Sequence, residues 1–271
     1  MNQEHDAYSP KQIAARVNTV GIAKANLPAL QTITLGVLAG AFIAFGAMFY
    51  TVVITDSALG FGPTRFLGGI AFSLGLVLVV VAGAELFTGN NLIVIAWAEQ
   101  KISGKQVLRN WSLVYLANLL GSLASAWFMA LSGSLHGADG AVAITALNIA
   151  ENKIAMSTME SFIRGILCNA LVCLAVWLCF SAHSVSGKIL AIILPISAFV
   201  ALGFEHSVAN MYLISVAIFA TDTTITWLDF LQNLIPVTAG NIIGGSVFVA
   251  LVYWLAYLHQ SALPKQDDDQ L

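Results

Sequence analysis

Charged residues are scarce in this sequence. They make up 9% of its 271 residues, whereas a soluble domain contains about 25%. Lysine and arginine number 11 against 14 aspartates and glutamates, so the net charge is −3 and there is no excess of basic residues to bind nucleic acid. These values exclude a soluble globular domain and a nucleic-acid-binding protein.

Cysteines and catalytic motifs are scarce as well. The three cysteines, Cys168, Cys173 and Cys179, lie in one apolar stretch at spacings that fit no zinc or redox site. Neither a His-Glu-x-x-His nor a Gly-x-Ser-x-Gly sequence occurs, which argues against an intramembrane enzyme, the alternative from a different class. The paired Asn-Pro-Ala motif of water and glycerol channels is also absent. We expect neither a cofactor nor a bound metal.

Apolar sequence is abundant. Hydrophobic residues make up 58% of the chain, and the mean hydropathy is +0.84. About 20 apolar residues cross the hydrocarbon core of a bilayer as a helix, and backbone groups in lipid must be paired within their own segment. The charge-poor runs therefore predict an all-α polytopic membrane protein with six spans. These lie within residues 25–55, 66–98, 110–135, 165–187, 189–221 and 230–264.

The basic residues predict the orientation of this protein. We expect one transmembrane domain over residues 25–260, a tail over residues 1–24 and a second tail over residues 261–271. Eight basic residues fall on the side of the tails: Lys11, Arg16, Lys24, Lys101, Lys105, Arg109, Lys188 and Lys265. Three fall on the other side: Arg65, Lys153 and Arg164. The positive-inside rule therefore places both termini in the cytoplasm.

Short motifs recur at nearly constant offsets. Residues 85–90 and 205–210 both read Glu, four residues, Asn, at an offset of 120, and Asn118–Ser122 resembles Asn241–Ser246 at an offset of 123. Residues 36–38 and 165–167 match at an offset of 129. The order of the matches predicts two halves of three spans each, about residues 25–135 and 160–260. Because three is odd, the second half is inverted relative to the first.

Polar residues interrupt the second and fifth predicted spans. Glu85 and the Glu205-His206 pair lie in the middle of the two longest apolar regions, and such groups would be costly facing lipid. We predict that each region breaks into two half-helices joined by a polar loop. The glutamates either tie down these loops by accepting backbone N–H bonds or act in a pore. His206 is the stronger pore candidate, because imidazole titrates near neutrality and can donate a hydrogen bond or a proton to a passing anion.

Three segments together resemble the formate/nitrite transporter family. They are Glu85–Asn90 (Glu-Leu-Phe-Thr-Gly-Asn), Gly203–Met211 and Ile235–Gly245, and the resemblance covers about residues 10–260. It implies an aquaporin-like fold and a homopentamer with one pore per protomer in the bacterial inner membrane. It also implies passage of small monovalent anions. We expect formate first, with nitrite or hydrosulfide as alternatives, and acetate and lactate are left open. Nitrite stays an alternative because Gly89 is closer to nitrite-type members.

The resemblance assigns pore roles by position. The pore centre is expected at His206, Thr88, Glu205 and Asn210. A cytoplasmic constriction is expected at Leu76, Leu86 and Phe87, and a periplasmic one at Phe72 and Phe199 with Asn169 close by. Lys153 resembles the vestibule lysine.

The apolar constrictions suggest how an anion could cross. Moving an ion into a low dielectric costs of order 20 kcal/mol by the idealised Born estimate. A weak acid avoids this cost if Lys153 concentrates the anion and a proton taken up near His206 lets it cross uncharged. Besides the anions, protons and membrane lipid are therefore expected partners, and flux should rise as external pH falls.

Overall fold

The computed structural model describes residues 7–220 and 223–259, and the regular structure there is helical apart from one β-bridge between Ala7 and Ala182. Within these residues, six helices are long and apolar enough to cross a membrane by length and composition. They cover Ala29–Ile54, Phe61–Gly83, Gly104–Leu131, Thr158–Ser181, Val185–Leu202 and Trp227–Tyr257. The predicted all-α protein with six apolar spans is confirmed.

The first half of the chain contains four helices in the membrane domain. They are α2 (Ala29–Ile54), α3 (Phe61–Val77), α4 (Val94–Ala98) and α5 (Gly104–Leu131). A π-helical turn, Leu78–Gly83, extends α3, and a 3₁₀ turn, Gly89–Ile93, precedes α4.

The second half repeats this order. It contains α7 (Thr158–Ser181), α8 (Val185–Leu202), α9 (Ser207–Leu213), α10 (Ser215–Ala220), α11 (Trp227–Gly245) and α12 (Val252–Tyr257), with a π-helical turn, Ser246–Leu251, between the last two.

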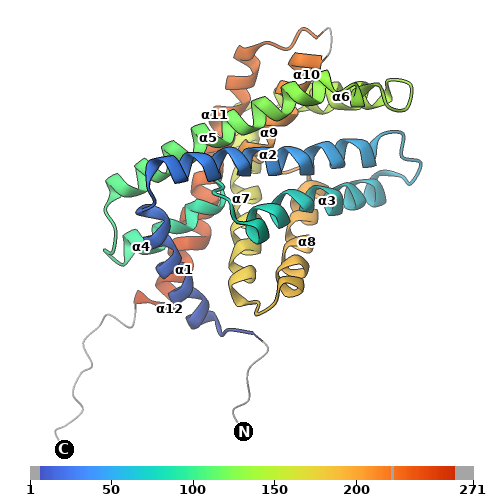
Figure 1. Cartoon of the computed structure of the whole chain (residues 1–271). Coiled ribbons are helices and arrows are strands. Elements are labelled where there is room, and N and C mark those ends of the chain that lie inside the picture. The colour runs from blue at the N-terminus through green and yellow to red at the C-terminus, as the bar shows by residue number, and fades with distance from the viewer. Residues whose placement is uncertain (1–6, 221–222, 260–271) are drawn as a thin grey trace, which may run out of the picture.

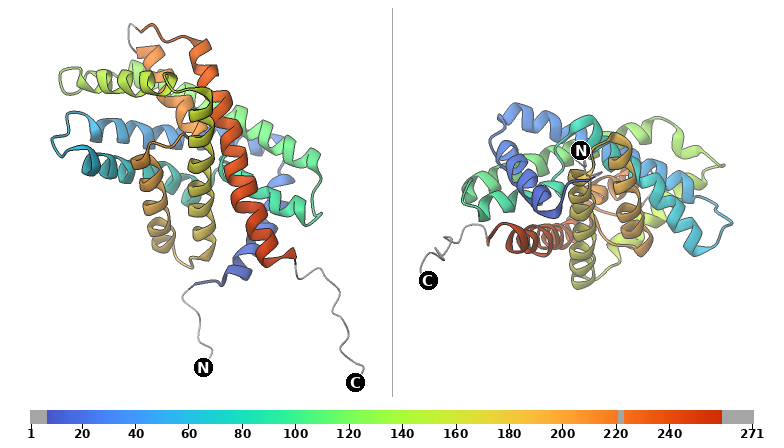
Figure 2. Two further views of the ribbon diagram at one scale, coloured as in Figure 1. Left: turned by 180° about the vertical axis from the view of Figure 1, so that it is seen from behind. Right: turned by 90° about the horizontal axis from the view of Figure 1, so that it is seen from below.

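Helix packing follows the predicted repeat. In the first half α2 packs against α3 and α5, and in the second half α7 packs against α8 and α11, while α3 and α8 join the halves. Figure 1 shows α2 beside α3 and α7 beside α8, and the view from behind in Figure 2 shows α11 running along α7. Each half crosses three times, so the two halves have opposite directions.

Gly121 and Gly244 allow close helix approaches at equivalent places in the repeat. A Cβ atom on Gly121 would lie 2.1 Å from the carbonyl oxygen of Val37, and one on Gly244 would lie 2.2 Å from that of Ile166. These residues are related by the same offsets, 123 and 129, as the sequence motifs. The α2–α5 and α7–α11 contacts therefore have the same packing, with an equivalent glycine against an equivalent carbonyl in each half.

Helices α1 (Pro10–Ala25) and α6 (Ala141–Ile154) lie outside the predicted spans. Residues 1–24 are expected to form a tail, yet α1 buries Ile13, Ala14 and Val17 in a cluster with residues of the second and sixth spans. Its apolar positions are few and only weakly periodic, so the sequence alone did not predict it. The 261–271 tail lies outside the described residues.

The described chain begins and ends on one face of the protein. Helices α1 and α12 are in contact and lie at the same end of the molecule in Figure 1. A 3₁₀ turn, Ser134–His136, and α6 lie toward the opposite end.

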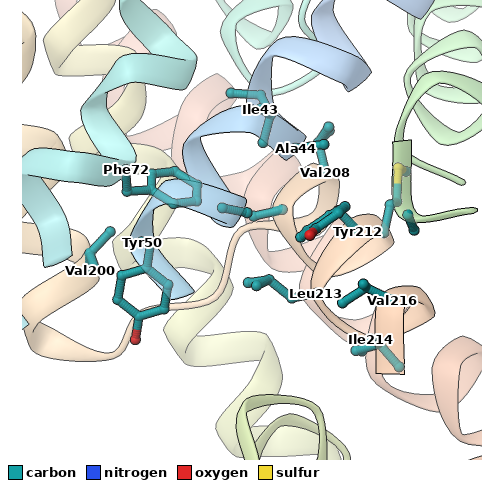
Figure 3. Packing of buried hydrophobic residues seen from close by; sticks show 14 of the residues in the cluster. Ile43, Ala44, Tyr50, Phe72, Val200, Val208, Tyr212, Leu213, Ile214 and Val216 are labelled. Atoms are coloured by element: carbon teal, nitrogen blue, oxygen red, sulfur yellow. The ribbon is translucent and has the colours of Figure 1, made fainter. Parts of the chain in front are cut away.

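A buried apolar cluster holds α9 between the halves. Figure 3 shows Tyr50 and Phe72 beside the segment that leads into α9, with Tyr212 and Leu213 of α9 beyond it. All four side chains are at most 6% exposed. The second break is thereby fixed by packing against both halves of the chain.

The glycine contact gives a first prediction. Gly244→Ala should destabilise the protein, because its methyl group would overlap the Ile166 carbonyl. Overpacking costs about 1–3 kcal/mol, which corresponds to a fall of about 2–10 °C in the unfolding midpoint of a chain this long. The midpoint is measured in detergent. Gly62→Ala, where a Cβ meets nothing within 4 Å, is the control and should match the native protein. Equal midpoints for all three would contradict the predicted close approach.

Candidate functional site

The second and fifth spans are both broken. The π-helical turn that extends α3 ends at Gly83 with φ +84°, and α8 ends at Leu202 and is followed by Gly203 with φ +71°, a left-handed conformation that favours glycine. After each glycine the chain becomes extended, with φ −142° at Ala84 and −111° at His206. The predicted breaks at Glu85 and Glu205 are thus present, and each loop leads into a short second helix.

Asn118 of α5 binds the backbone of the first break. Its Nδ2 donates to the carbonyl oxygens of Gly36 at 2.7 Å and Glu85 at 2.9 Å, and its Oδ1 accepts from the Phe87 N–H at 2.9 Å. The side chain is fully buried. One amide therefore pairs two backbone groups that the break leaves free, the Glu85 carbonyl and the Phe87 N–H, and ties them to Gly36 in the middle of α2.

Asn241 of α11 does the same at the second break. Its Nδ2 donates to the carbonyl oxygens of Gly165 at 2.8 Å and Glu205 at 2.9 Å, and its Oδ1 accepts from the Ser207 N–H at 2.8 Å. We call Asn118 and Asn241 the clamp asparagines. The sequence analysis used both as markers of the repeat without assigning them a role.

Glu85 anchors the first loop through side chains. Its Oε1 accepts from Lys24 Nζ at 2.6 Å, and its Oε2 accepts from Asn90 Nδ2 at 2.7 Å. Asn110 accepts from Asn90 at 3.0 Å and donates to the Lys24 carbonyl at 3.1 Å. The carboxylate therefore lies in a closed network with one lysine and two asparagines.

Glu205 anchors the second loop in the same way. It accepts from Lys153 Nζ at 2.8 Å and from Asn210 Nδ2 at 2.6 Å. Asn233 accepts from Asn210 at 2.8 Å and donates to the Lys153 carbonyl at 2.9 Å. The glutamates tie down the loops, but the expected partners were wrong: among the described residues, both carboxylates accept from lysine and asparagine side chains and not from backbone N–H groups.

Thr88 and His206 meet at the centre. Thr88 Oγ1 lies 2.8 Å from His206 Nε2, and both residues are buried. His206 Nδ1 accepts the Ala209 N–H at 3.0 Å as the N-cap of α9. Because an accepting nitrogen carries no proton, we infer that the neutral ring carries its proton on Nε2 and donates to Thr88. The ring also stacks on Phe199, with centroids 6.0 Å apart.

Two cavities border this pair. The Glu85-side cavity has a volume of about 420 Å³, and Lys24, Glu85, Leu76, Leu86 and Gly89 are among the residues that line it. Thr88 itself does not line this cavity, but it belongs to the same loop as Leu86 and Gly89, which do.

The Glu205-side cavity has a volume of about 480 Å³, and Lys153, Glu205, His206, Asn210, Phe72 and Phe199 are among the residues that line it. Phe72 and Phe199 make an edge-to-face contact with centroids 5.6 Å apart. The Thr88–His206 hydrogen bond therefore connects a segment that borders one cavity with a segment that borders the other.

The structure brings most of the predicted site residues to these two cavities, but Thr88, Phe87 and Asn169 line neither. Thr88 is bonded to His206, which does line one of them, and the other two are exceptions. Phe87 does not line either cavity and packs edge-to-face on Tyr115 at 4.9 Å and Trp111 at 6.3 Å. Of the three residues predicted for the cytoplasmic constriction, Leu76 and Leu86 line the Glu85-side cavity. Phe87 packs on the aromatic side chains of α5 instead.

Asn169 is the second exception, because it does not join Phe72 and Phe199. Its amide donates to the Thr88 carbonyl at 3.2 Å, to Asn91 Oδ1 at 2.7 Å and to the Asn241 carbonyl at 2.7 Å. It therefore fixes the backbone of Thr88.

Sequence reasoning missed Lys24, Asn110 and Asn233 as site residues. The signal was present in the repeat, because Lys24 and Lys153 differ by 129 and Asn110 and Asn233 by 123. Lys24 was taken only as a basic tail residue. Applying the offsets to every polar residue would have matched Lys24 with Lys153 and Asn110 with Asn233 as equivalent residues of the two halves.

Six apolar helices in two opposed halves, with two broken spans between two cavities, define a membrane transport protein of the broken-helix type. The family model described as Formate/nitrite transporter matches residues 11–255. The chain belongs to this family.

Individual relatives agree with this assignment. The chain is 39% identical to the formate channel FocA of Escherichia coli (strain K12) over 275 residues, 94% of this chain and 96% of that protein. A solved structure titled as a pentameric formate channel with formate bound is 42% identical and has a TM-score of 0.80, with 85% of this chain and 98% of that chain covered. An FNT family ion channel is 32% identical with a TM-score of 0.81, covering 91% and 98%.

The clamp asparagines give a second prediction. Asn241→Leu should destabilise the protein, because the Ser207 N–H and the Glu205 carbonyl of the break lose their buried partner. Each such group costs about 1–3 kcal/mol, so detergent-purified protein should unfold at a clearly lower temperature. Asn152→Ala removes an exposed amide that makes one bond to the Asn148 carbonyl and serves as the control. A native midpoint in Asn241→Leu would refute the clamp.

Proposed function

We propose that this protein is a channel for small weak-acid anions, with formate as its first solute. The observation that carries the proposal is the Thr88–His206 hydrogen bond of 2.8 Å, which joins a residue of the Glu205-side cavity to the loop whose Leu86 and Gly89 line the Glu85-side cavity. It is the expected place for a small polar solute to be recognised. The relatives named as formate channels support the choice of solute.

The walls of the junction determine in which form the solute crosses. Phe72 and Phe199 line the Glu205-side cavity, and Leu76 and Leu86 line the Glu85-side cavity. A bare anion there would meet a desolvation cost of order 20 kcal/mol in the idealised limit. A weak acid escapes that cost by crossing in its neutral form, whereas chloride cannot.

His206 acts in this proposal as a hydrogen-bond donor. Its Nδ1 is occupied by the Ala209 N–H, so charging the ring would sacrifice the cap of α9. The Nε2–H can turn from Thr88 to the solute, and the Thr88 hydroxyl can then bind the solute too. The proton that neutralises the anion comes from solvent in the Glu205-side cavity.

Location and assembly are part of the proposal. The basic residues favour a bacterial inner membrane with both termini in the cytoplasm, so the Glu85-side cavity opens to the cytoplasm and the Glu205-side cavity to the periplasm. A homopentamer with one pore per protomer is favoured by the solved relative titled as pentameric. Exposed apolar side chains on α2, α5 and α11 would then contact neighbouring subunits and lipid.

Nitrite or hydrosulfide is the second candidate solute. The chain carries Gly89-Asn90-Asn91 after the threonine, and Gly89 is closer to nitrite-type members. The amides of Asn90 and Asn91 are engaged with Glu85 and Asn169, which leaves Gly89 as the distinctive residue at the cavity wall. Acetate and lactate are larger members of the same solute class.

A solute panel tests the function itself. Purified protein in proteoliposomes should conduct formate, and smaller fluxes of nitrite, hydrosulfide, acetate and lactate would rank the other solutes. Chloride and glycerol should stay at the level of protein-free vesicles, because chloride has no neutral form and glycerol is not a weak acid. Glycerol flux with no formate flux would refute the proposal.

Two substitutions of His206 test its role. Asparagine keeps an acceptor for the Ala209 N–H and carries an amide donor on a shorter side chain than the imidazole that reaches Thr88, but it does not titrate. His206→Asn should therefore still conduct formate, with a flux that rises as external pH falls, by up to about tenfold per pH unit. His206→Phe lacks the donor, worth about 1–3 kcal/mol, and should lose about tenfold or more.

The outcomes separate the two possible roles of the histidine. A pH-independent flux in His206→Asn would make the imidazole the proton source and overturn the solvent route. Native flux in both variants would remove His206 from the pathway. His136→Asn, at an exposed position in the 3₁₀ turn near α6, is the matched control and should conduct as the native protein.

A further inference from the structure

The charges that line each cavity do not cancel. The Glu205-side cavity is lined by Arg65, Lys153 and Arg164 and by the carboxylates of Glu160 and Glu205. The Glu85-side cavity is lined by Lys24 and Lys188 and by Glu85. Each cavity therefore carries one more positive than negative side chain within the described chain.

The lysine expected to attract anions is already paired. Lys153 Nζ lies 2.8 Å from Glu205, and the two side chains are 11% and 3% exposed. Such a pair is a short dipole with little net field across the cavity. Removing Lys153 would also leave Glu205 buried and uncompensated. Lys24 is held in the same way by Glu85 at 2.6 Å.

Arg65 and Lys188 are different. No ion pair of either residue occurs in the described part of the chain. Arg65 donates to the Tyr50 hydroxyl at 3.2 Å, and its buried Nε has no hydrogen-bond partner among residues 7–220 and 223–259. Arg164, by contrast, is bound to Glu160 one turn away on α7. Each cavity thus has one wall cation without a carboxylate.

We propose that Arg65 and Lys188, rather than Lys153 and Lys24, collect the anion in the two cavities. This inference rests on the proposed function. A free positive charge raises the local concentration of anions before the apolar junction. A unit charge about 8 Å from an anion in water enriches it about two- to threefold. The pairs at Glu85 and Glu205 are left to position the loops.

The first test is charge exchange on one cavity. Formate flux into proteoliposomes is measured below saturation. Arg65→Gln should lower it about two- to threefold, and Lys188→Gln should do the same from the other cavity. Glu160→Gln frees Arg164, which still donates to the Gly203 carbonyl at 3.1 Å, and should raise the flux about two- to threefold. Arg65→Gln with Glu160→Gln should return to the native value.

The second test is screening. The Debye length shortens from about 30 Å at 0.01 M to about 3 Å at 1 M salt, so high salt screens the two free cations. The formate flux of the native protein should then fall toward that of the double variant Arg65→Gln, Lys188→Gln. That double variant should respond little to salt. Tyr50→Phe removes the hydrogen bond and keeps the charge, so its salt response should stay native. Lys105→Gln, an exposed cation that lines neither cavity, should leave the flux unchanged.

The outcomes are distinguishable. Native flux and native salt response in Arg65→Gln and Lys188→Gln would overturn the inference while formate conduction stands. Arg65→Gln could also lose formate flux in a way that Glu160→Gln does not restore and that high salt does not reproduce in the native protein. This result would show a structural role for Arg65 and would overturn the inference as well. If Arg65→Gln does not fold, the proposal is tested by two other variants. Arg65→Lys keeps the positive charge and should keep the native flux, and Glu160→Gln should raise it; failure of both results would overturn the inference. Absence of formate flux in the native protein would instead refute the proposed function.

Discussion

The structure depends on pairing the backbone where two membrane helices are interrupted. Inside a bilayer an unpaired amide or carbonyl costs several kcal/mol, and each break exposes such groups. Asn118 and Asn241 solve this problem with one side chain per break, because an amide offers two donors and one acceptor in a fixed geometry. With the loops fixed, Thr88 of the first loop and His206 of the second can meet at 2.8 Å.

The same constraint explains why charge is used sparingly. Glu85 and Glu205 are buried at 5% and 2% exposure, and a lone buried carboxylate would be strongly unfavourable. Each is therefore compensated by a lysine from a different helix, Lys24 or Lys153, and by an asparagine from its own half-helix. These networks join distant segments, so the helix α1 that carries Lys24 becomes part of the channel domain rather than a tail.

Much of this architecture could be predicted from the sequence. The spans followed from the charge-poor runs and the breaks from Glu85 and Glu205, because lipid imposes strict rules on composition. Side-chain direction did not follow. Phe87 turns to Tyr115 and Asn169 to the Thr88 carbonyl, since rotamers within a packed loop are chosen by neighbours that are far away in the chain. The partners of the glutamates were missed for the same reason, and α1 was missed because its apolar pattern is weak.

The repeat also separates scaffold from function. Residues that hold the loops obey the offsets of 120, 123 and 129: Glu85 with Glu205, Asn118 with Asn241, Lys24 with Lys153. Residues at the centre do not. The position equivalent to His206 is Leu86, and the position equivalent to Thr88 is Val208. Symmetric packing needs the same residue twice, whereas a single solute site at the junction of two halves needs a donor and a hydroxyl once. Arg65 and Lys188 are likewise unmatched, with Val185 and Gly68 at the equivalent positions, which is the pattern expected of residues that meet the solute.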